Sequence, residues 1–374
     1  MKKNTLIICL IIIIILSSFS ASNDTIRLFT GTYTEGTRKG FFILDLNRET
    51  GTFKLISESD AGPNPAYFCI SNKNGFIYAA NEVEEFNGVK GGGVTALSYN
   101  AKTGIARKVG ELAVPNGGPA YIAISPNDDF LFLANYSGGS VAVVKLNENG
   151  IPVSVTDTIV YKAGVGKVSH AHMISFDPSG KRVYVTDLGL DRVVIYDFDT
   201  VSGKLIQIPD GIASLQEGAG PRHFVFTSDG SKLYVINELN STITFFGVNK
   251  NGELQQVQTV STLRESFKGE SYCADIHLGK NEKFLYGSNR GENTIVTFKV
   301  GPDGRLTLAG HTSCGGDWPR NFVLDPSGKY ILVGNQNSGN ISMFRIDEET
   351  GLPVGPSKDY KIASPVCLKF AGAK

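Results

Sequence analysis

Short apolar runs that alternate with polar residues recur along almost the whole chain. In one stretch they occupy residues 120–125, 130–136, 140–147 and 153–160, and Pro, Asn, Asp and Gly residues separate them. No segment carries a convincing apolar period of 3.6 residues, which an amphipathic helix would need. The pattern therefore predicts short β-strands in groups of four, connected by turns.

One sequence frame returns at intervals of 46 to 54 residues. The segment PNPAYFCISNKNGFIYAANE (63–82) resembles GGPAYIAISPNDDFLFLANY (117–136), and four further copies follow. The equivalent positions are Pro65, Pro119, Ala171, Pro221, Cys273, Pro319 and Pro365. Repeats of about 50 residues with four strands each are typical of a β-propeller.

The two ends of the chain carry complementary parts of one more repeat. Residues 27–33, 39–47 and 53–57 supply three strands and lack an inner one, whereas residues 365–370 supply only an inner strand. Pairing the N-terminal strands with the C-terminal strand closes the ring and removes an open sheet edge. We expect an all-β, seven-bladed β-propeller with four antiparallel strands per blade, in a single domain over residues 23–374.

Residues 1–22 have a different composition from the repeats. Two lysines precede an apolar run over 6–16, and small residues follow around Ala21, which is the layout of a secretory signal peptide. The apolar run is shorter than the roughly 20 residues of a membrane span. We expect an exported protein, periplasmic in a Gram-negative source and free of the membrane after cleavage; an uncleaved anchor is the alternative.

The charge balance of the chain bears on its binding partners, and its cysteines bear on the core. Lys and Arg number 36, as do Asp and Glu, and loss of Lys2 and Lys3 leaves the chain close to neutral. This balance does not predict binding to nucleic acid or to an acidic membrane. Four scattered cysteines remain, without a C-x-x-C motif, and we interpret them as core residues, with one disulfide as the alternative: Cys69, Cys273, Cys314 and Cys367.

Two rings of positions at one end of the channel follow from the repeat. Counting residues outward from the hairpin turn places Arg222 opposite Asn237 and next to Glu238. The start of the inner strand and the end of the second strand therefore lie at the same end of the channel. The ring at the inner-strand starts is Ala66, Ala120, His172, Arg222, Ala274, Arg320 and Val366. The ring at the second-strand ends is Tyr33, Glu82, Tyr136, Leu188, Glu238, Arg290 and Gln336.

The charged members of these rings suggest chemistry on a carbonyl compound with an anionic group. Arginine keeps its charge and must find an anion or a carboxylate in a narrow channel. Guanidinium groups also stabilise an oxyanion as it forms, and a carboxylate or imidazole can activate water. Glu238 and His172 are the candidates for water activation; a salt bridge between Arg222 and Glu238 that only braces the hairpin is the alternative.

Two other patterns receive structural interpretations. The HAH motif at 170–172 has no third cluster of ligands, so no metal site is expected, and no cofactor motif is present. Asparagine recurs at the ends of the second strands, with Asp187 in the same place, and we interpret these residues as caps of backbone groups: Asn81, Asn135, Asn237, Asn289 and Asn335.

Long motifs in four of the repeats resemble those of the seven-bladed propeller lactonase family, which includes bacterial 6-phosphogluconolactonases of propeller type and fungal carboxy-muconate cyclases. These motifs are GPRHFVFTSDGSKLYVINEL, LYGSNRGENTI, AHMISFDPSGKRVYVTDLGLDRV and PRNFVLDPSGKYILVGNQNSGNISMFRID. The resemblance extends over about residues 27–370 and implies a metal-independent site of His172, Arg222, Glu238 and Arg290. A second set of candidates, for substrate contact or support, is His170, Asp187, His223, Arg320 and Gln336.

The predicted function is hydrolysis of a sugar-derived or similar small anionic lactone to its open hydroxy acid. An export signal does not suit a phosphorylated sugar lactone of the cytoplasm, so the motifs support lactone chemistry better than that substrate. Two alternatives stay open. One is cyclisation of an unsaturated dicarboxylate to a lactone, and the other is a binding propeller that presents its faces to a periplasmic protein or glycan.

Overall fold

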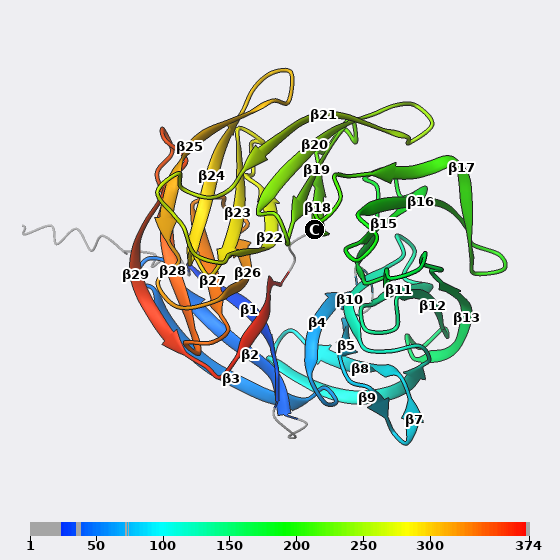
Figure 1. Ribbon diagram of the computed structural model, residues 1–374. Coiled ribbons are helices and arrows are strands. Elements are labelled where there is room, and N and C mark those ends of the chain that lie inside the picture. The colour runs from blue at the N-terminus through cyan, green and yellow to red at the C-terminus, as the bar shows by residue number, and fades with distance from the viewer. Residues whose placement is uncertain (1–23, 35–38, 72, 74, 372–374) are drawn as a thin grey trace, which may run out of the picture.

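The computed structural model describes residues 24–34, 39–71, 73 and 75–371. In this part of the chain, seven four-stranded antiparallel sheets stand around a common axis, and a two-stranded ribbon joins β6 (Glu85–Phe86) to β7 (Val89–Lys90) (Figure 1). The described residues contain no helix long and apolar enough to cross a bilayer. The predicted seven-bladed propeller is confirmed, whereas the predicted signal peptide over 1–22 lies outside the described residues.

Each blade contains four strands in order from the axis to the rim. The inner strands are β4 (Pro65–Ile70), β10 (Pro119–Ile124), β14 (Ala171–Phe176), β18 (Pro221–Phe226), β22 (Tyr272–Leu278), β26 (Pro319–Leu324) and β30 (Pro365–Phe370). The second strands are β5 (Phe76–Asn81), β11 (Phe130–Asn135), β15 (Arg182–Asp187), β19 (Lys232–Asn237), β23 (Phe284–Arg290), β27 (Tyr330–Asn335) and β1 (Thr25–Thr32).

The two outer layers follow the same order around the ring. The third strands are β8 (Gly92–Asn100), β12 (Ser140–Leu146), β16 (Arg192–Asp199), β20 (Thr242–Val248), β24 (Thr294–Val300), β28 (Asn340–Ile346) and β2 (Lys39–Asn47). The outer strands are β9 (Ile105–Val114), β13 (Pro152–Val160), β17 (Lys204–Ser214), β21 (Leu254–Ser261), β25 (Leu306–Ser313), β29 (Pro353–Lys361) and β3 (Thr52–Asp60). The four segments predicted between 120 and 160 match β10 to β13 within one residue at each end.

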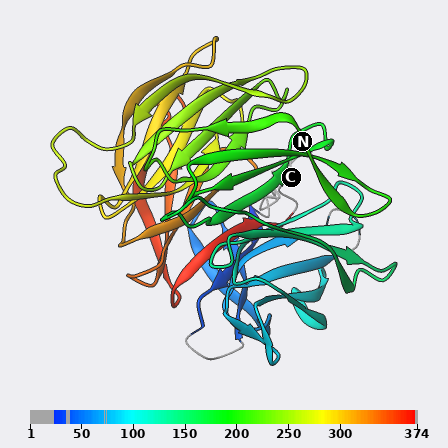
Figure 2. The ribbon, with the colours of Figure 1, turned by 45° about the vertical axis from the view of Figure 1, so that its right-hand side comes forward.

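The ring closes as predicted, by pairing of the two ends of the chain. The strand β30 lies antiparallel to β1, with Leu28 opposite Phe370 and Gly31 opposite Cys367. In Figures 1 and 2 the red C-terminal strands lie beside the blue N-terminal strands. One blade is therefore built from both ends of the chain, and all seven blades have four strands.

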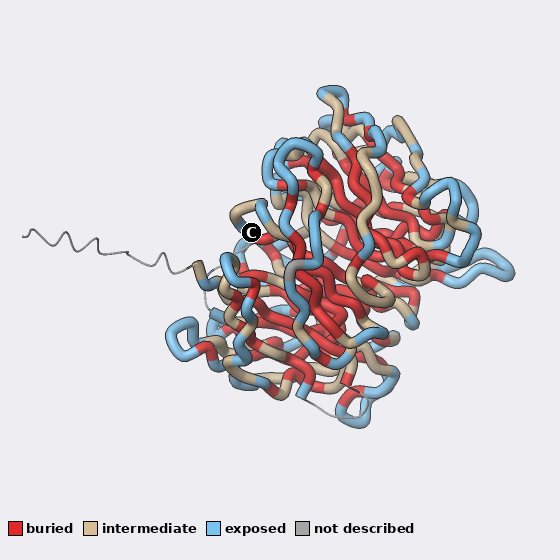
Figure 3. The backbone as a smooth tube through the Cα atoms, turned by 90° about the vertical axis from the view of Figure 1, so that its left-hand side faces the viewer, coloured by how far each residue is buried: buried red, intermediate tan, exposed pale blue. Residues whose placement is uncertain are grey.

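Buried residues concentrate in the inner layers of the blades, and exposed residues concentrate in the loops and the outer strands (Figure 3). A tyrosine in the second strand of four blades donates a hydrogen bond to a turn glycine of the following blade. These pairs, at 2.7 to 2.9 Å, are Tyr78 with Gly150 O, Tyr184 with Gly252 O, Tyr234 with Gly304 O and Tyr286 with Gly351 O. Because each tyrosine ring is buried, the bond satisfies its hydroxyl and ties adjacent blades together.

Every inner strand carries a β-bulge near its start. In β18, Pro221 pairs with Asn237 and His223 pairs with Ile236, so Arg222 has no partner in the ladder. The same shift of register recurs in the other six blades. The predicted pairing of Arg222 with Asn237 is therefore wrong by one residue, because it assumed an unbroken ladder. A bulge turns the side chain of its extra residue away from the regular alternation, here toward the end of the channel.

Candidate active site

A carboxylate bridges two arginines at the end of the channel. Atom Oε2 of Glu238 lies 2.9 Å from Nε of Arg222 and 2.7 Å from Nη2 of Arg290. The side chains of Arg222 and Arg290 are 2% and 5% exposed, and that of Glu238 is 16% exposed. The three residues come from the bulge of β18, the residue after β19 and the end of β23. The ring positions read from the repeat thus converge on one point, which we call the channel mouth.

Main-chain carbonyl groups of β22 hold both guanidinium groups in place. Arg290 donates from Nε to Tyr272 O at 3.2 Å and from Nη2 to Cys273 O at 2.9 Å. Arg222 donates from Nη1 to the carbonyl oxygen of Ala274. Donors fixed in this way need no rearrangement when negative charge develops nearby, which is the property that stabilises an oxyanion.

Burial and like charge change the proton affinities of this cluster. Burial, with the charges of Arg290 and Arg320, lowers the pKa of Arg222 to about 9, so it stays protonated at neutral pH. Burial opposes ionisation of Glu238, but Arg290, Arg222 and Arg320 outweigh it and bring the pKa below its usual value. The cluster therefore consists of two cations and one anion at neutral pH.

The imidazole of His172 occupies the bulge of β14 and faces the same mouth. Its ring centroid is 5.6 Å from that of Tyr136. Burial and the neighbouring Arg222 lower the pKa of His172 well below its usual value, so the ring is neutral at pH 7. Its Nδ1 atom is buried and has no hydrogen-bond partner within the described residues. A buried polar atom of this kind is available to a ligand or a water molecule.

A second cluster of ionisable side chains lies at the mouth, around Arg320 in the bulge of β26. The hydroxyl of Tyr33 donates to Oε2 of Glu82 at 2.7 Å, and the same oxygen lies 3.8 Å from Nη2 of Arg320. The guanidinium carbon of Arg320 is 5.3 Å from the centre of the Tyr33 ring. Counted with the first cluster, the mouth holds more guanidinium groups than carboxylates, which favours an anionic ligand.

Two predicted residues support the mouth instead of facing it. Asp187 is completely buried, and it accepts hydrogen bonds from Ser169 Oγ at 2.9 Å and from the His170 main-chain N–H at 3.0 Å. This is the capping role predicted for its position, not a substrate contact. His170 is half-buried, lies with Nδ1 3.0 Å from the carbonyl oxygen of Tyr136 and stacks on that ring at 4.5 Å. It fixes Tyr136 at the mouth.

The asparagines at the equivalent strand ends are also used for capping. Asn81 donates to the carbonyl oxygens of Ala61 and Pro63, and Asn289 donates to that of Thr262. Their side chains are fully buried. The interpretation of this recurring position as repeat architecture is confirmed at these residues.

One layer below the mouth, His223 forms a buried pair with Asp275. His223 Nδ1 lies 2.8 Å from Asp275 Oδ1, and the other carboxylate oxygen lies 3.0 Å from Nε2 of His277. The stacked rings of Tyr67 and Tyr121, 4.1 Å apart, pack against the edge of His223. His223 also lines a cavity of about 380 Å³ together with Tyr67, Tyr121 and Asp275. On the side of the mouth it approaches Arg222, whose Nη1 is 3.5 Å from Nε2.

Sequence reasoning missed Asp275. The signal that could have revealed it is a carboxylate in an inner strand at a level where three other copies carry the apolar or aromatic residues Tyr67, Tyr121 and Met173. A fully buried carboxylate requires partners.

The four cysteines are buried and unpaired, as the core interpretation expects. Among the described residues, no group of three or more His, Cys, Asp or Glu side chains is arranged to hold a metal ion.

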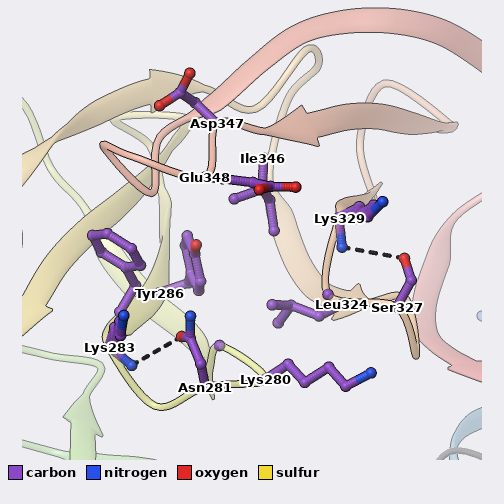
Figure 4. Close-up of a pocket in the computed structure, with 13 residues that line it drawn as sticks. Lys280, Asn281, Lys283, Tyr286, Leu324, Ser327, Lys329, Ile346, Asp347 and Glu348 are labelled. Carbon is purple, nitrogen blue, oxygen red and sulfur yellow. Dashed lines mark hydrogen bonds between the residues drawn. The ribbon is translucent and has the colours of Figure 1, made fainter.

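A separate cavity of about 370 Å³ lies at the opposite end of the blades (Figure 4). The turn between β22 and β23 and the turn between β26 and β27 form its walls, with Lys280, Lys329 and Tyr286 among the lining residues. It contains none of the predicted site residues. The cavity sits where Tyr286 reaches the next blade, so we regard it as a product of blade packing.

Seven four-stranded blades around a charged mouth define a β-propeller with the features of an enzyme site. The chain belongs to the family described as "Lactonase, 7-bladed beta-propeller", whose model matches residues 27–370. It is 30% identical to a 6-phosphogluconolactonase of Bacillus subtilis over 91% of this chain and 97% of that protein.

Two solved structures are also similar over nearly their whole length. A putative 6-phosphogluconolactonase of Bacteroides fragilis has a TM-score of 0.85 and 31% identity, covering 94% of this chain and 99% of that one. The periplasmic gluconolactonase of Pseudomonas aeruginosa has a TM-score of 0.85 and 29% identity, covering 93% of this chain and 99% of that one.

Proposed function

We propose that this protein hydrolyses a small lactone to its open hydroxy acid at the channel mouth, without a metal ion. The observation that carries the proposal is the bridging of Arg222 and Arg290 by one oxygen of Glu238. This arrangement combines two fixed oxyanion donors with a carboxylate that can handle a proton. Family membership supports lactone chemistry in general, and the mouth is our assignment of its location.

In the proposed reaction, the lactone carbonyl oxygen points toward Arg222 and Arg290. A water molecule attacks the carbonyl carbon and gives a proton to Glu238 through Oε1, since both arginines make their closest contacts with Oε2. The carbonyl oxygen becomes an oxyanion that the guanidinium groups stabilise. When the tetrahedral intermediate collapses, the ring C–O bond breaks and the ring oxygen takes the proton from Glu238. Lactone and water thus yield one hydroxy acid.

The role of His172 in this scheme follows from its neutral state. Its low proton affinity makes it a weak base, but Nδ1 or Nε2 can exchange a hydrogen bond with the attacking water or with a substrate hydroxyl. We therefore assign proton transfer to Glu238 and orientation of water or substrate to His172.

The test is a pH-stat assay of acid release from glucono-δ-lactone, its 6-phosphate and an unsubstituted aliphatic lactone. We expect hydrolysis above the spontaneous rate for at least one of them. The rate should be equal before and after dialysis of the protein against EDTA. In the E238Q variant, kcat should be about 100-fold lower or more. Spontaneous rates with all three lactones would refute the proposal. Loss of activity in EDTA would refute metal independence alone.

We also propose that the protein is exported and acts in the periplasm. The support is the segment 1–22, with its lysines, apolar run and small residues. Fractionation of cells that produce the full chain tests this proposal. We expect the protein in the periplasmic fraction with its N-terminus near residue 23, whereas a full-length protein in the cytoplasm would contradict it.

A further inference from the structure

The half of the channel away from the mouth contains the cavity of about 380 Å³ that His223 lines. Six of the seven inner strands supply lining residues, namely β4, β10, β14, β18, β22 and β30, so this cavity lies on the axis of the ring. We call it the axial cavity. Its lining does not include Arg222, Glu238 or Arg290. Its volume lies within the range of roughly 300–1,000 Å³ that is typical of small-molecule sites.

One residue of each inner strand lies at the level of this cavity. The strand registers place these seven residues opposite equivalent positions of the second strands. They are Cys69, Ala123, Ser175, Val225, His277, Val323 and Lys369. Small or apolar residues are sufficient to close a channel, and five of the seven positions carry them. Lys369 and His277 are the exceptions, and both line the axial cavity.

The ammonium group of Lys369 has an aromatic neighbour but no anionic partner. Its Nζ atom lies 4.7 Å from the centre of the Tyr67 ring. Within the described part of the chain, Lys369 forms no ion pair and its ammonium group donates no hydrogen bond, although the residue is half-buried. An ammonium has three N–H donors, so the acceptors for Lys369 must come from solvent or from a ligand.

The carboxylate in the cavity wall, Asp275, does not serve as that acceptor. Asp275 is almost completely buried, and its oxygens lie 2.8 Å from Nδ1 of His223 and 3.0 Å from Nε2 of His277. The side-chain amide of Asn321 donates to the same carboxylate. The charge of Asp275 is thus compensated by its own neighbours, and Lys369 remains the unpaired charge of the cavity.

Much of the remaining wall is apolar or aromatic. Met173, Phe224 and Phe226 line the cavity from β14 and β18, and the stacked rings of Tyr67 and Tyr121 line it from β4 and β10. Such a wall stabilises a ligand by removing apolar surface from water. A single cation beside apolar walls therefore fits an organic anion better than an inorganic one.

We propose that the axial cavity is a second ligand site, which binds a small organic carboxylate with an apolar body. Lys369 binds the carboxylate group, and Met173, Phe224 and Phe226 contact the apolar part. The Nδ1 atom of His277 can exchange a further hydrogen bond with the ligand, since Nε2 already contacts Asp275. The site is distinct from the mouth and adds a binding function that does not depend on lactone hydrolysis.

Calorimetric titration of the full chain with three probes tests the class of ligand: benzoate, acetate and benzamide. Benzoate combines a carboxylate with an apolar ring, acetate carries the charge with almost no apolar body, and benzamide carries the ring without the charge. We expect saturable binding of benzoate and at least about tenfold weaker binding of the other two. Absence of benzoate binding, or binding no tighter than that of either other probe, would overturn the proposal.

Two variants locate the bound carboxylate, because the arginines of the mouth can also bind an anion. K369M keeps an unbranched side chain of similar length and removes the charge, so benzoate should bind at least about tenfold more weakly. R320Q removes a cation of the mouth and should change benzoate binding less than about twofold. Weakening in R320Q with normal binding in K369M would place benzoate at the mouth and refute the axial site.

A third variant leaves Lys369 in place and decides the question if K369M does not fold. Ser175 lines the axial cavity and is half-buried, so the larger side chain of S175F should occupy part of its space. We expect loss of benzoate binding in S175F, with acid release from a lactone unchanged. Benzoate binding equal to that of the wild-type protein would refute the proposal. These titrations need no turnover, so failure of the lactonase proposal would leave their result intact.

Discussion

His223 and Asp275 form a buried pair, 2.8 Å between Nδ1 and Oδ1, directly below the mouth. Since the carboxylate accepts a hydrogen bond from Nδ1–H of His223, Nε2 carries the lone pair that faces Nη1 of Arg222 at 3.5 Å. Burial and Arg222 lower the pKa of His223 to about 4. Burial opposes ionisation of Asp275, but His277 and His223 hold its pKa well below the usual value. The pair is therefore a neutral imidazole and a carboxylate.

Loss of this carboxylate should destabilise the propeller. In D275N the amide cannot accept hydrogen bonds from both imidazoles, and we expect the free energy of unfolding to fall by about 1–3 kcal/mol. Urea unfolding followed by fluorescence measures the change. The control is D303N, at an exposed residue paired only with Arg305, for which we expect a change within about 0.5 kcal/mol. Equal effects in both variants would contradict a special role for Asp275.

The free energy of unfolding should rise with pH between about 4 and 6.5. His172 and His223 both have a lower pKa in the folded protein than in an unfolded chain, so the unfolded state binds more protons in this window. Stability is then complete above the unfolded value of about 6.5 and declines as the pH falls. Urea midpoints measured from pH 4.5 to 7.5 test this. H172Q should flatten the curve, and a wild-type curve without slope would contradict the prediction.

Replacement of Glu238 should affect activity and stability together. E238Q removes the charge that offsets two nearly buried arginines, and we expect about 1–3 kcal/mol of destabilisation beside the loss of kcat. Thermal denaturation and the lactone assay give the two readouts. E217Q is the matched control, because Glu217 pairs with Lys167 where both side chains are largely exposed; it should alter neither. A stable and fully active E238Q protein would contradict the site.

The tyrosine bonds between blades should contribute to stability without affecting the mouth. Y286F leaves the carbonyl oxygen of Gly351 without its donor and should cost about 1–3 kcal/mol. Y184F should cost a similar amount through Gly252. The two sites share no partner, so the effects should add in the double variant within about 0.5 kcal/mol. Chemical denaturation measures all three, and altered kcat in either single variant would contradict the separation from the site.

Closure of the ring by β30 should be required for cooperative folding. A chain that ends at Ser364 lacks β30 and exposes the edge of β1, whose hydrogen-bonding groups then lack partners. We expect aggregation, or loss of a single unfolding transition, in circular dichroism and sedimentation measurements. A chain that ends at Ala371 keeps β30 and serves as the control. A soluble, cooperative protein without β30 would refute the requirement.

The repeat explains why so much of the fold could be predicted. An equivalent proline recurs in five of the seven blades and similar turns follow it, so strand ends such as those of β10 to β13 and the seven ring positions follow from alignment of the chain with itself. Arg222, Glu238 and Arg290 converge because the repeat places all three at the same level of the disc.

Other features depend on geometry that the pattern does not contain. The bulge at Arg222 interrupts a ladder that looks regular in the sequence. The partner of His223 comes from the next blade, 52 residues away. Finally, the difference between Arg290 and Arg320 lies in hydrogen bonds to main-chain carbonyl groups, which side-chain identity does not reveal.

The bulges separate the chemistry of the mouth from the folding of the blades. Because each bulge residue stands outside the strand ladder, its replacement removes no hydrogen bond of the ladder. Alanine already occupies three of the seven bulges, at Ala66, Ala120 and Ala274. Evolution or design can therefore rewrite the substrate preference of this scaffold one blade at a time, with the architecture held constant.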